Sequence, residues 1–489
     1  MMRMVTGDGR ELLLAGNSIG FEINNPYFED DAIPGTTSLP FRFGWNRDNL
    51  RALGFPNRYR GTGGPAAVPV QLFVDGPLWK LGALRYKGCD EAKQQLTYNF
   101  VADAADLAAQ IKGVRISDID LGTVPFVRDN EQEAYALLPV QNTAFYGDKN
   151  KDFKGVLNYY GPGGYVQQPG STHAFAPQPY FVPVLRQVLA HFGWSISGEF
   201  LDEPEIQALV IYSDRALEDE AGAVLAEVEL ARHVPEMLVA DFLIAVQGLF
   251  TLGYNFNPQR RELRIRRLGH ELARTDYADR AGRLLESKPN LSTGWHLTQS
   301  PDSNDELDKT LDTSWQELRL GAAGQKVQVD AGTLHMVRVE DALQPGRRWL
   351  LPAVESKGAS AAYELGEDSR VGLRLLFNRG MQPDSQGNEY PLGSAANEDY
   401  AGGEVGQLTL HWDGPQGLYE QFAKEWLAFR SRAVETRYEV EFSLADLRSI
   451  DPGRLEMLDY HLRLWQQINV TIDLQRKLTK ATIIYQEVR

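Results

Sequence analysis

The fold is decided by the stretch PYFVPVLRQVLAHFGWSISGEFLDEPEIQALVIYS, residues 179–213. Its first half carries apolar residues at helical spacing, namely Val184, Leu185, Val188, Leu189 and Phe192. Gly193 follows directly and predicts the end of a helix, because glycine readily adopts the left-handed conformation that closes helices. The segments WSISGEF and ALVIYS then have the apolar and β-branched character of strands.

A second stretch repeats this plan: LVADFLIAVQGLFTLGYNFNPQRRELRIRRL, residues 238–268. Its helical stripe consists of Phe242, Leu243, Val246, Leu249 and Phe250. Gly253 is the predicted stop, and YNFN and RELRIRRL are predicted strands joined by a turn at Pro258–Gln259. Since a helix with one apolar face needs a sheet to cover it, the repeat predicts two related modules that lie near one another.

The rest of the chain shows mainly the patterns of strands and turns, so the predicted class is α+β and β-rich. We expect two related β-barrel-type modules with short packed helices, an N-terminal β region and a C-terminal closing β segment. The predicted domains are an N-terminal β-rich domain over 1–135, a Gly/Pro/Tyr-rich link over 136–178, paired helix and hairpin modules over 179–285, a second β-rich domain ending in an amphipathic helix over 286–435, and the C-terminal β segment over 436–489.

Three local patterns outside the repeat make further predictions. VPVQLFVDGPLWKLGALRYKG, residues 68–88, has two apolar runs around Asp75–Gly76 and predicts a hairpin. QGLYEQFAKEWLAFRSR, residues 416–432, predicts an amphipathic helix. SLPFRFGWNRDNLRALGFPNRYRGTGG, residues 38–64, has no clean period and predicts a long ordered loop or arm.

The composition is that of a globular protein, with 43% apolar residues in a chain of 489. No run approaches the roughly 20 apolar residues that a membrane span needs. The first residues, MMRMVTGDGRELLLAG, lack the apolar core of a signal peptide, so we expect synthesis and folding in the cytoplasm. The formal net charge of −16 argues against sequence-specific contact with nucleic acid. The single cysteine, Cys89, excludes a disulfide framework and thiolate metal clusters.

No catalytic, cofactor-binding or metal-binding residue is predicted. GNSIG, residues 16–20, matches a nucleophile elbow around Ser18, but that elbow needs a helix next, and FEINNPYFED is not helical. No two of the eight histidines lie within five residues of each other, so a set of metal ligands would have to be assembled by the fold. Four acidic clusters are interpreted as solvated loops: Glu29–Asp31, Asp202–Glu205, Glu218–Glu220 and Asp302–Asp308.

Several stretches also follow one another in a distinctive order. They are SLPFRFGWNRDNLRALGFPNRY, the pair VLRQVLAHFGWSISGEF and LVADFLIAVQGLFTLGYNFNPQRRELRI, then RLLFNRGMQPDSQGNEYPLGS and GLYEQFAKEWLAF, and last YEVEFSLADLRSIDPGRLEMLDYHLRLWQQINVTIDLQRKLTKATIIYQEV. In this order they resemble the baseplate hub family of tailed phages and contractile injection machines, which includes the late control protein D type.

The resemblance implies a non-enzymatic structural protein of a phage-type tail, without a cofactor. Members of the family form homotrimers in which each chain contributes two similar barrel domains, so three chains mimic six at the tail tube. The implied partners are further copies of the chain, the tail tube or distal tail protein, the tip or spike protein and a tape-measure protein. DNA would pass through the lumen without specific binding. The implied location is the virion tail, after assembly in the host cytoplasm.

Two other classes of function stay open at this stage. The 9 tryptophans and 20 tyrosines suit a carbohydrate-binding, receptor-recognition tail protein, which would expose aromatic side chains along a groove. A glycoside hydrolase would use two of the loop carboxylates.

Overall fold

The computed structural model describes residues 2–15, 18–30, 36–38, 41–58, 65–74, 76–102, 107, 110–129, 132–147, 150–166, 173–257, 259–290, 294–300, 305–321, 324–358, 372–473 and 478–488. The chain forms two compact units, neither of which is a continuous stretch of sequence. Unit 1 consists of Met1–Gln110, Gly253–Thr293 and Glu425–Arg489, and unit 2 consists of Ile111–Leu252 and Gly294–Lys424.

Unit 1 is built mainly of strands. They are β1 (Met2–Thr6), β2 (Glu11–Leu12), β3 (Ser18–Asn24), β4 (Thr36–Ser38), β5 (Phe41–Gly44), β6 (Val68–Val74), β7 (Leu78–Asp90), β8 (Gln95–Ala102), β19 (Leu252–Asn257), β20 (Glu262–Arg267), β21 (Tyr277–Asp279), β22 (Gly282–Lys288), β31 (Glu435–Ser443), β32 (Leu455–Leu458), β33 (His461–Asp473) and β34 (Leu478–Glu487). Its short helices are α1 (Arg47–Ala52), α6 (Leu268–Leu272), α7 (Lys424–Arg432) and α8 (Leu444–Arg448).

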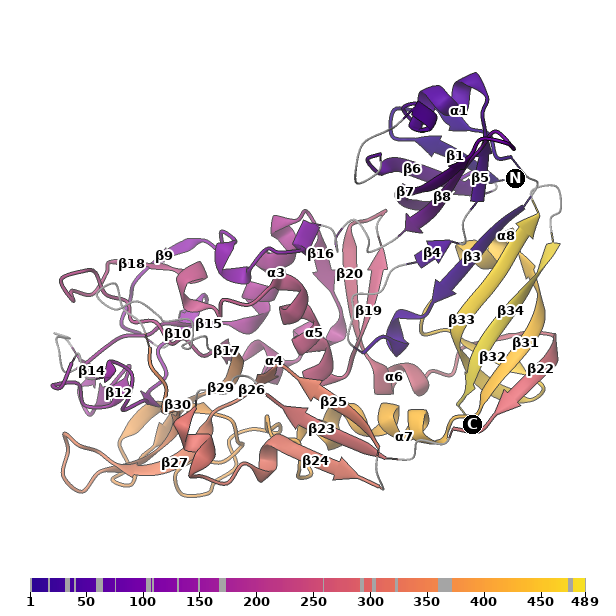
Figure 1. Cartoon of the computed structure of the whole chain (residues 1–489). Helices are drawn as coiled ribbons and strands as arrows, with labels where there is room; N and C mark the ends of the chain where they lie inside the picture. Colours follow the sequence, from indigo (N-terminus) through magenta and orange to yellow (C-terminus); the bar gives the residue numbers. More distant parts are fainter. Residues whose placement is uncertain are drawn as a thin grey trace. The chain divides into compact units, whose positions relative to one another are not determined.

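Most of these strands belong to one large sheet in the order β2-β1-β6-β7-β8-β4-β3-β33-β34-β31-β22. The sheet curls in two halves (Figure 1): β1 and β5 to β8 form one, and β3 with β31, β33 and β34 forms the other. The halves combine distant sequence, since β3 pairs antiparallel with β33 and aligns Phe21 with Val470. The prediction of a β-rich α+β fold is confirmed, and the N-terminal region and the closing C-terminal segment supply both halves.

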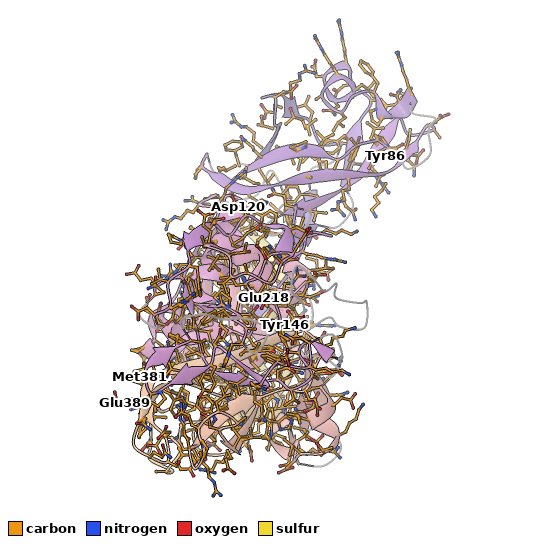
Figure 2. The ribbon with its side chains drawn as sticks, turned by 90° about the vertical axis from the view of Figure 1, so that its left-hand side faces the viewer. Tyr86, Asp120, Tyr146, Glu218, Met381 and Glu389 are labelled. Atoms are coloured by element: carbon orange, nitrogen blue, oxygen red, sulfur yellow. The ribbon has the colours of Figure 1, made fainter. Side chains whose placement is uncertain are left out.

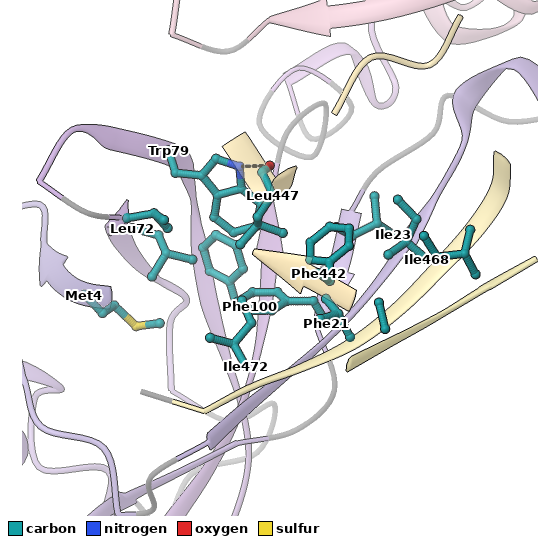
Figure 3. Close-up of a cluster of buried hydrophobic side chains, with 14 of the residues drawn as sticks. Met4, Phe21, Ile23, Leu72, Trp79, Phe100, Phe442, Leu447, Ile468 and Ile472 are labelled. Atoms are coloured by element: carbon teal, nitrogen blue, oxygen red, sulfur yellow. Dashed lines mark hydrogen bonds between the residues drawn. The ribbon is translucent and has the colours of Figure 1, made fainter. Parts of the chain in front are cut away.

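The core of unit 1 lies between these curled halves (Figure 3). Trp79 packs edge-on against Phe21, with ring centroids 5.4 Å apart. Its indole N–H donates to the carbonyl of Leu447 at 2.7 Å, which ties α8 to β7. Phe442 and Phe100 are fully buried in the same cluster. This burial of large aromatic side chains is what joins segments separated by more than 300 residues of sequence.

Unit 2 has shorter strands in several small sheets. Its strands are β9 (Thr123–Pro125), β10 (Tyr135–Ala136), β11 (Val140–Gln141), β12 (Val156–Leu157), β13 (Tyr160–Gly161), β14 (Gly164–Tyr165), β15 (Gln178–Pro179), β16 (Ser195–Ser197), β17 (Leu209–Ile211), β18 (Glu227–Glu229), β23 (Trp295–Gln299), β24 (Glu317–Leu320), β25 (Gln325–Val329), β26 (Ala331–Gly332), β27 (His335–Glu340), β28 (Arg348–Ala353), β29 (Leu373–Pro383) and β30 (Glu389–Ser394). Its helices are α3 (Phe181–His191), α4 (Pro204–Gln207), α5 (Val239–Phe250) and a π-helix at Tyr419–Ala423. Short 3-10 helices in the two units lie at Pro26–Phe28, Pro56–Arg58, Ile116–Asp118, Glu199–Asp202, Leu230–His233, Glu306–Lys309 and Ser314–Gln316.

Both helices of the predicted repeat are present as α3 and α5. Gly193 follows the C-cap of α3 with a left-handed φ of 72°, and it ends the helix as predicted. The prediction that Gly253 ends the second helix is wrong, because Thr251 is the C-cap of α5, with a φ of 49°. Gly253 lies inside β19, where an added Cβ would come within 2.6 Å of Tyr27 and Leu268. The two helices contact each other, with the ring of Phe181 centred 6.2 Å from that of Phe242.

Two segments without a clear period in the sequence contain regular structure or buried contacts in their described parts, which exclude 39–40, 59–64, 148–149 and 167–172. The predicted loop at 38–64 contains β5, α1 and a 3-10 turn at Pro56–Arg58, and α1 is capped by Asn46, which accepts from the N–H of Asn49 at 2.7 Å. The predicted link over 136–178 lies inside unit 2, and much of it is buried. Asn158 shows why: its amide donates to Leu138 and Ala176 carbonyls at 3.0 and 2.9 Å, which satisfies backbone groups that a periodic strand would pair.

Two further local predictions are confirmed, whereas Pro258 of the predicted turn at Pro258–Gln259 lies outside the described residues. β6 and β7 form the hairpin around Gly76, which has a φ of 105°. The amphipathic helix at 416–432 appears as the π-helix followed by α7. Within the described ranges no helix has the length and apolar character to cross a membrane.

Candidate functional sites

Among the residues that the structure describes, one cluster of possible metal ligands is assembled, from Asp305, Asp308 and His335 in unit 2. His335 Nε2 lies 2.7 Å from Asp308 Oδ1, and Asp305 Oδ2 accepts from Arg374 Nη1 at 2.8 Å. Burial raises the pKa of Asp308, but its hydrogen bonds with His335 and Gln316 lower it more. The pKa of Asp308 is therefore below its ordinary value. Asp305, one of the three possible ligands, is thus already paired with the guanidinium of Arg374. The sequence pointed to the acidic stretch at 302–308 but not to His335 or Arg374, which come from distant strands.

A serine and a histidine also meet in unit 2. Ser213 Oγ lies 3.0 Å from His233 Nδ1, and both side chains are buried. Burial lowers the pKa of His233 to about 3, whereas a general base works best with a pKa near the operating pH. Among the described residues no carboxylate is hydrogen-bonded to His233, so the third group that orients a catalytic histidine is missing. We interpret the pair as a structural contact. Ser18, the elbow candidate, starts strand β3 instead of leading into a helix.

Asp305 and Asp308, from one predicted acidic cluster, have carboxylate oxygens within 4.8 Å of each other, whereas described members of the other clusters form separate contacts. Glu218 accepts from the hydroxyl of Tyr146 at 2.6 Å, close together in Figure 2, and burial raises its pKa. Asp219, the next residue, accepts from the backbone of Ala221 and Ala223 in a tight turn. In the cluster Glu29–Asp31, the carboxylate of Asp30 pairs with Arg430 at 2.8 Å. The contacts of Glu218, Asp219 and Asp30 are those of loop and ion-pair residues.

A buried charged cluster surrounds Arg347, which sequence analysis did not identify. Its Nε donates to Asp384 at 2.6 Å and its Nη1 to Asp341 at 3.0 Å. The guanidinium carbon lies 4.1 Å from the ring centroid of Trp349. All three charged side chains are buried, so the cluster is a structural element of the core and not a surface that meets a ligand.

An open pocket of about 300 Å³ lies in unit 1, between the β19–β20 hairpin and the segment around α8. Four basic side chains line it: Lys80, Arg260, Arg264 and Arg448. One acidic side chain, Glu262, also faces it. Trp79 and Trp465 contribute to its floor, and only 7% and 4% of their surfaces are exposed. The pocket is thus a cationic hollow in a chain of net charge −16.

A free sheet edge is the second exposed feature of unit 1. Strand β22 ends the path of the large sheet, and its only sheet neighbour among the described strands is β31. Leu284 and Leu285 are 49% and 44% exposed, and a β-bulge between Leu284 and Glu286 interrupts the pairing of β22 with β31 at this point. An edge strand with exposed leucines is a template for pairing with another chain.

Comparison with known proteins gives no close relative. No protein-family model matches the sequence, and no curated protein sequence matches it. Among solved structures, the 43 kDa tail protein of prophage MuSo2 from Shewanella oneidensis has a TM-score of 0.37 and 8% identity, over 99% of this chain and 97% of that one. The tail protein from Neisseria meningitidis MC58 has a TM-score of 0.35 and 9% identity, over 99% and 96% of the two chains. These structures are tail proteins; at such scores the likeness carries no argument about this chain.

Proposed function

We propose that this chain is a non-enzymatic structural protein of a phage-type tail. In this proposal three copies form a ring, which is the baseplate hub between the tail tube or distal tail protein and the tip or spike. The order of the segments that resemble the hub family supports the assignment. The β-rich fold, with a large sheet curled in two halves, is compatible with it.

The observation that carries the proposal is the free edge of β22. A seven-residue strand that leaves Leu284 and Leu285 exposed is costly in a protein that stays alone, because it invites pairing with other chains. In an assembled ring the same edge is an interface. Pairing of β22 with a neighbouring copy extends the sheet from one protomer to the next and buries both leucines.

The charge of the chain fits the passage of DNA. With 66 acidic against 50 basic residues, a ring of these chains repels the phosphate backbone, so DNA passes through the lumen without specific binding. The tape-measure protein is a further proposed partner, and the virion tail is the proposed location.

Electron microscopy of the purified protein tests the assignment. Negative-stain class averages should show rings with threefold symmetry and a central channel. Averages that show only single, unassociated particles at micromolar concentration contradict the ring, and they also contradict the proposed role of β22. A matched preparation of Leu284→Glu should lose the rings while a preparation of Leu343→Glu, which alters a leucine with 39% exposure in unit 2, retains them.

A further inference from the structure

We propose that the pocket of unit 1 is an anion-binding site, which takes a ligand with two negative charges on carboxylate or phosphate groups and an apolar portion beside them. This goes beyond the tail role, which assigns no ligand to the chain. The site is built from the β19–β20 hairpin on one side and α8 with the residues after it on the other.

The charge balance of the pocket is the first argument. Four basic side chains and one acidic side chain line it, a net charge of +3, whereas the whole chain carries −16. Three of the basic side chains, Arg260, Arg264 and Arg448, are exposed, and in the described part of the chain no carboxylate lies within ion-pair distance of them. The three arginines repel one another, so a bound anion stabilises the arrangement. Guanidinium groups present paired donors that match carboxylate and phosphate oxygens.

The rigidity of the pocket is the second argument. Trp79 donates its indole N–H to Leu447 at 2.7 Å, and Trp465 donates to Asp451 at 2.9 Å, so both rings hold the segment that carries Arg448. Gln259 donates to the carbonyls of Leu78 and Trp79 at 3.0 and 2.8 Å, which fixes the turn of the hairpin. The walls that carry the arginines are therefore positioned before any ligand arrives, and a preorganised site loses little entropy on binding.

The apolar portion of the ligand follows from the rest of the lining. Phe256, Ile450 and Pro452 lie in the same pocket as the arginines. A volume of about 300 Å³ is at the lower end of small-molecule sites, which fits a group of the size of one aromatic or sugar ring. A bare inorganic anion leaves this apolar wall uncovered.

Isothermal titration calorimetry on the full chain tests the site with phenyl phosphate, phthalate and benzyl alcohol. We expect both dianions to bind, more weakly as salt screens the arginines, and the neutral alcohol not to bind. The tighter of the two dianions identifies phosphate or carboxylate as the natural anion.

Matched variants locate the binding. Arg264→Glu and Arg448→Glu, on opposite walls, should each weaken it at least about tenfold, since each loses a charge-assisted contact and adds repulsion. Arg85→Glu alters an exposed arginine of β7 that does not line the pocket, and binding should be unchanged. The proposal is overturned if neither dianion binds the wild-type protein, or if Arg85→Glu weakens binding as much as the pocket variants do. Circular dichroism of each variant confirms that it is folded.

Discussion

Arg347 Nε lies 2.6 Å from Asp384 Oδ2 in the interior of unit 2, and neither side chain is exposed to solvent. Burial raises the pKa of Asp384, but backbone hydrogen bonds and Arg347 lower it by more than burial raises it. The pKa therefore lies below its ordinary value, and the carboxylate stays ionised. Asp341 holds the same guanidinium from a second side at 3.0 Å. A buried cation is thus compensated by two carboxylates, and the removal of one leaves charge in an apolar interior.

Asp384→Asn should therefore destabilise the protein strongly. We expect a loss of about 3–5 kcal/mol in the free energy of unfolding, measured by urea titration followed by circular dichroism. The control is Lys309→Ala, which breaks the exposed pair with Glu306 and should cost less than about 1 kcal/mol. Equal losses in the two variants contradict a structural role for the buried cluster.

His233 should make stability depend on pH. Burial lowers its pKa to about 3 in the folded chain, against about 6.5 in the unfolded chain. Between these values the unfolded chain binds the proton and the folded chain does not, so stability falls on acidification from pH about 6.5 to 3.

His233→Gln removes this titration and retains an acceptor for the hydroxyl of Ser213. Between pH 7 and 4.5 the wild type should lose about 2–3 kcal/mol more than the variant, as measured by urea titration at both pH values. An equal loss in both proteins means that His233 does not carry the effect. His191→Gln, at an exposed histidine, serves as the control and should follow the wild type.

Gly253 and Thr251 should respond in opposite directions. Gly253→Ala places a Cβ within 2.6 Å of Tyr27 and Leu268, so we expect a loss of about 1–3 kcal/mol from overpacking. Thr251→Gly relieves a threonine with a φ of 49° and should stabilise the protein by about 1 kcal/mol. Thermal unfolding of both variants measures the two shifts. A neutral Gly253→Ala would show that β19 tolerates a side chain there, against the packing described above.

The leucines of β22 should control self-association and leave folding intact. Leu285→Glu places a charge at the proposed interface and should weaken association at least about tenfold by sedimentation velocity, since a buried unpaired charge is costly. Because this side chain is 44% exposed in the single chain, the melting temperature of the unassociated protein should change little. Unchanged association in the variant excludes β22 as the interface.

Much of the fold was predictable where one local signal is enough. The apolar stripe at 184–192 with Gly193 behind it predicted α3, and the pattern around Gly76 predicted the β6–β7 hairpin. Gly253 was misinterpreted because a glycine after a helix has the same sequence pattern whether it closes the helix or makes room for Tyr27. The segment around Asn158 looked like a link because side-chain amides, and not a periodic strand ladder, satisfy its backbone.

The candidate sites could not be predicted because each depends on contacts across long sequence separations. His335 reaches Asp308 from 27 residues away, and Arg347 reaches Asp384 from 37 residues away. The pocket in unit 1 joins residues near 80, 260 and 450. Periodicity describes which face of an element is apolar, but it does not state which other element covers that face.

The native mass of the purified protein, measured by light scattering over a concentration series, tests the central claim most directly. The ring predicts a mass of three times the 54.8 kDa of the single chain. A mass of one chain at every concentration contradicts self-assembly into a ring.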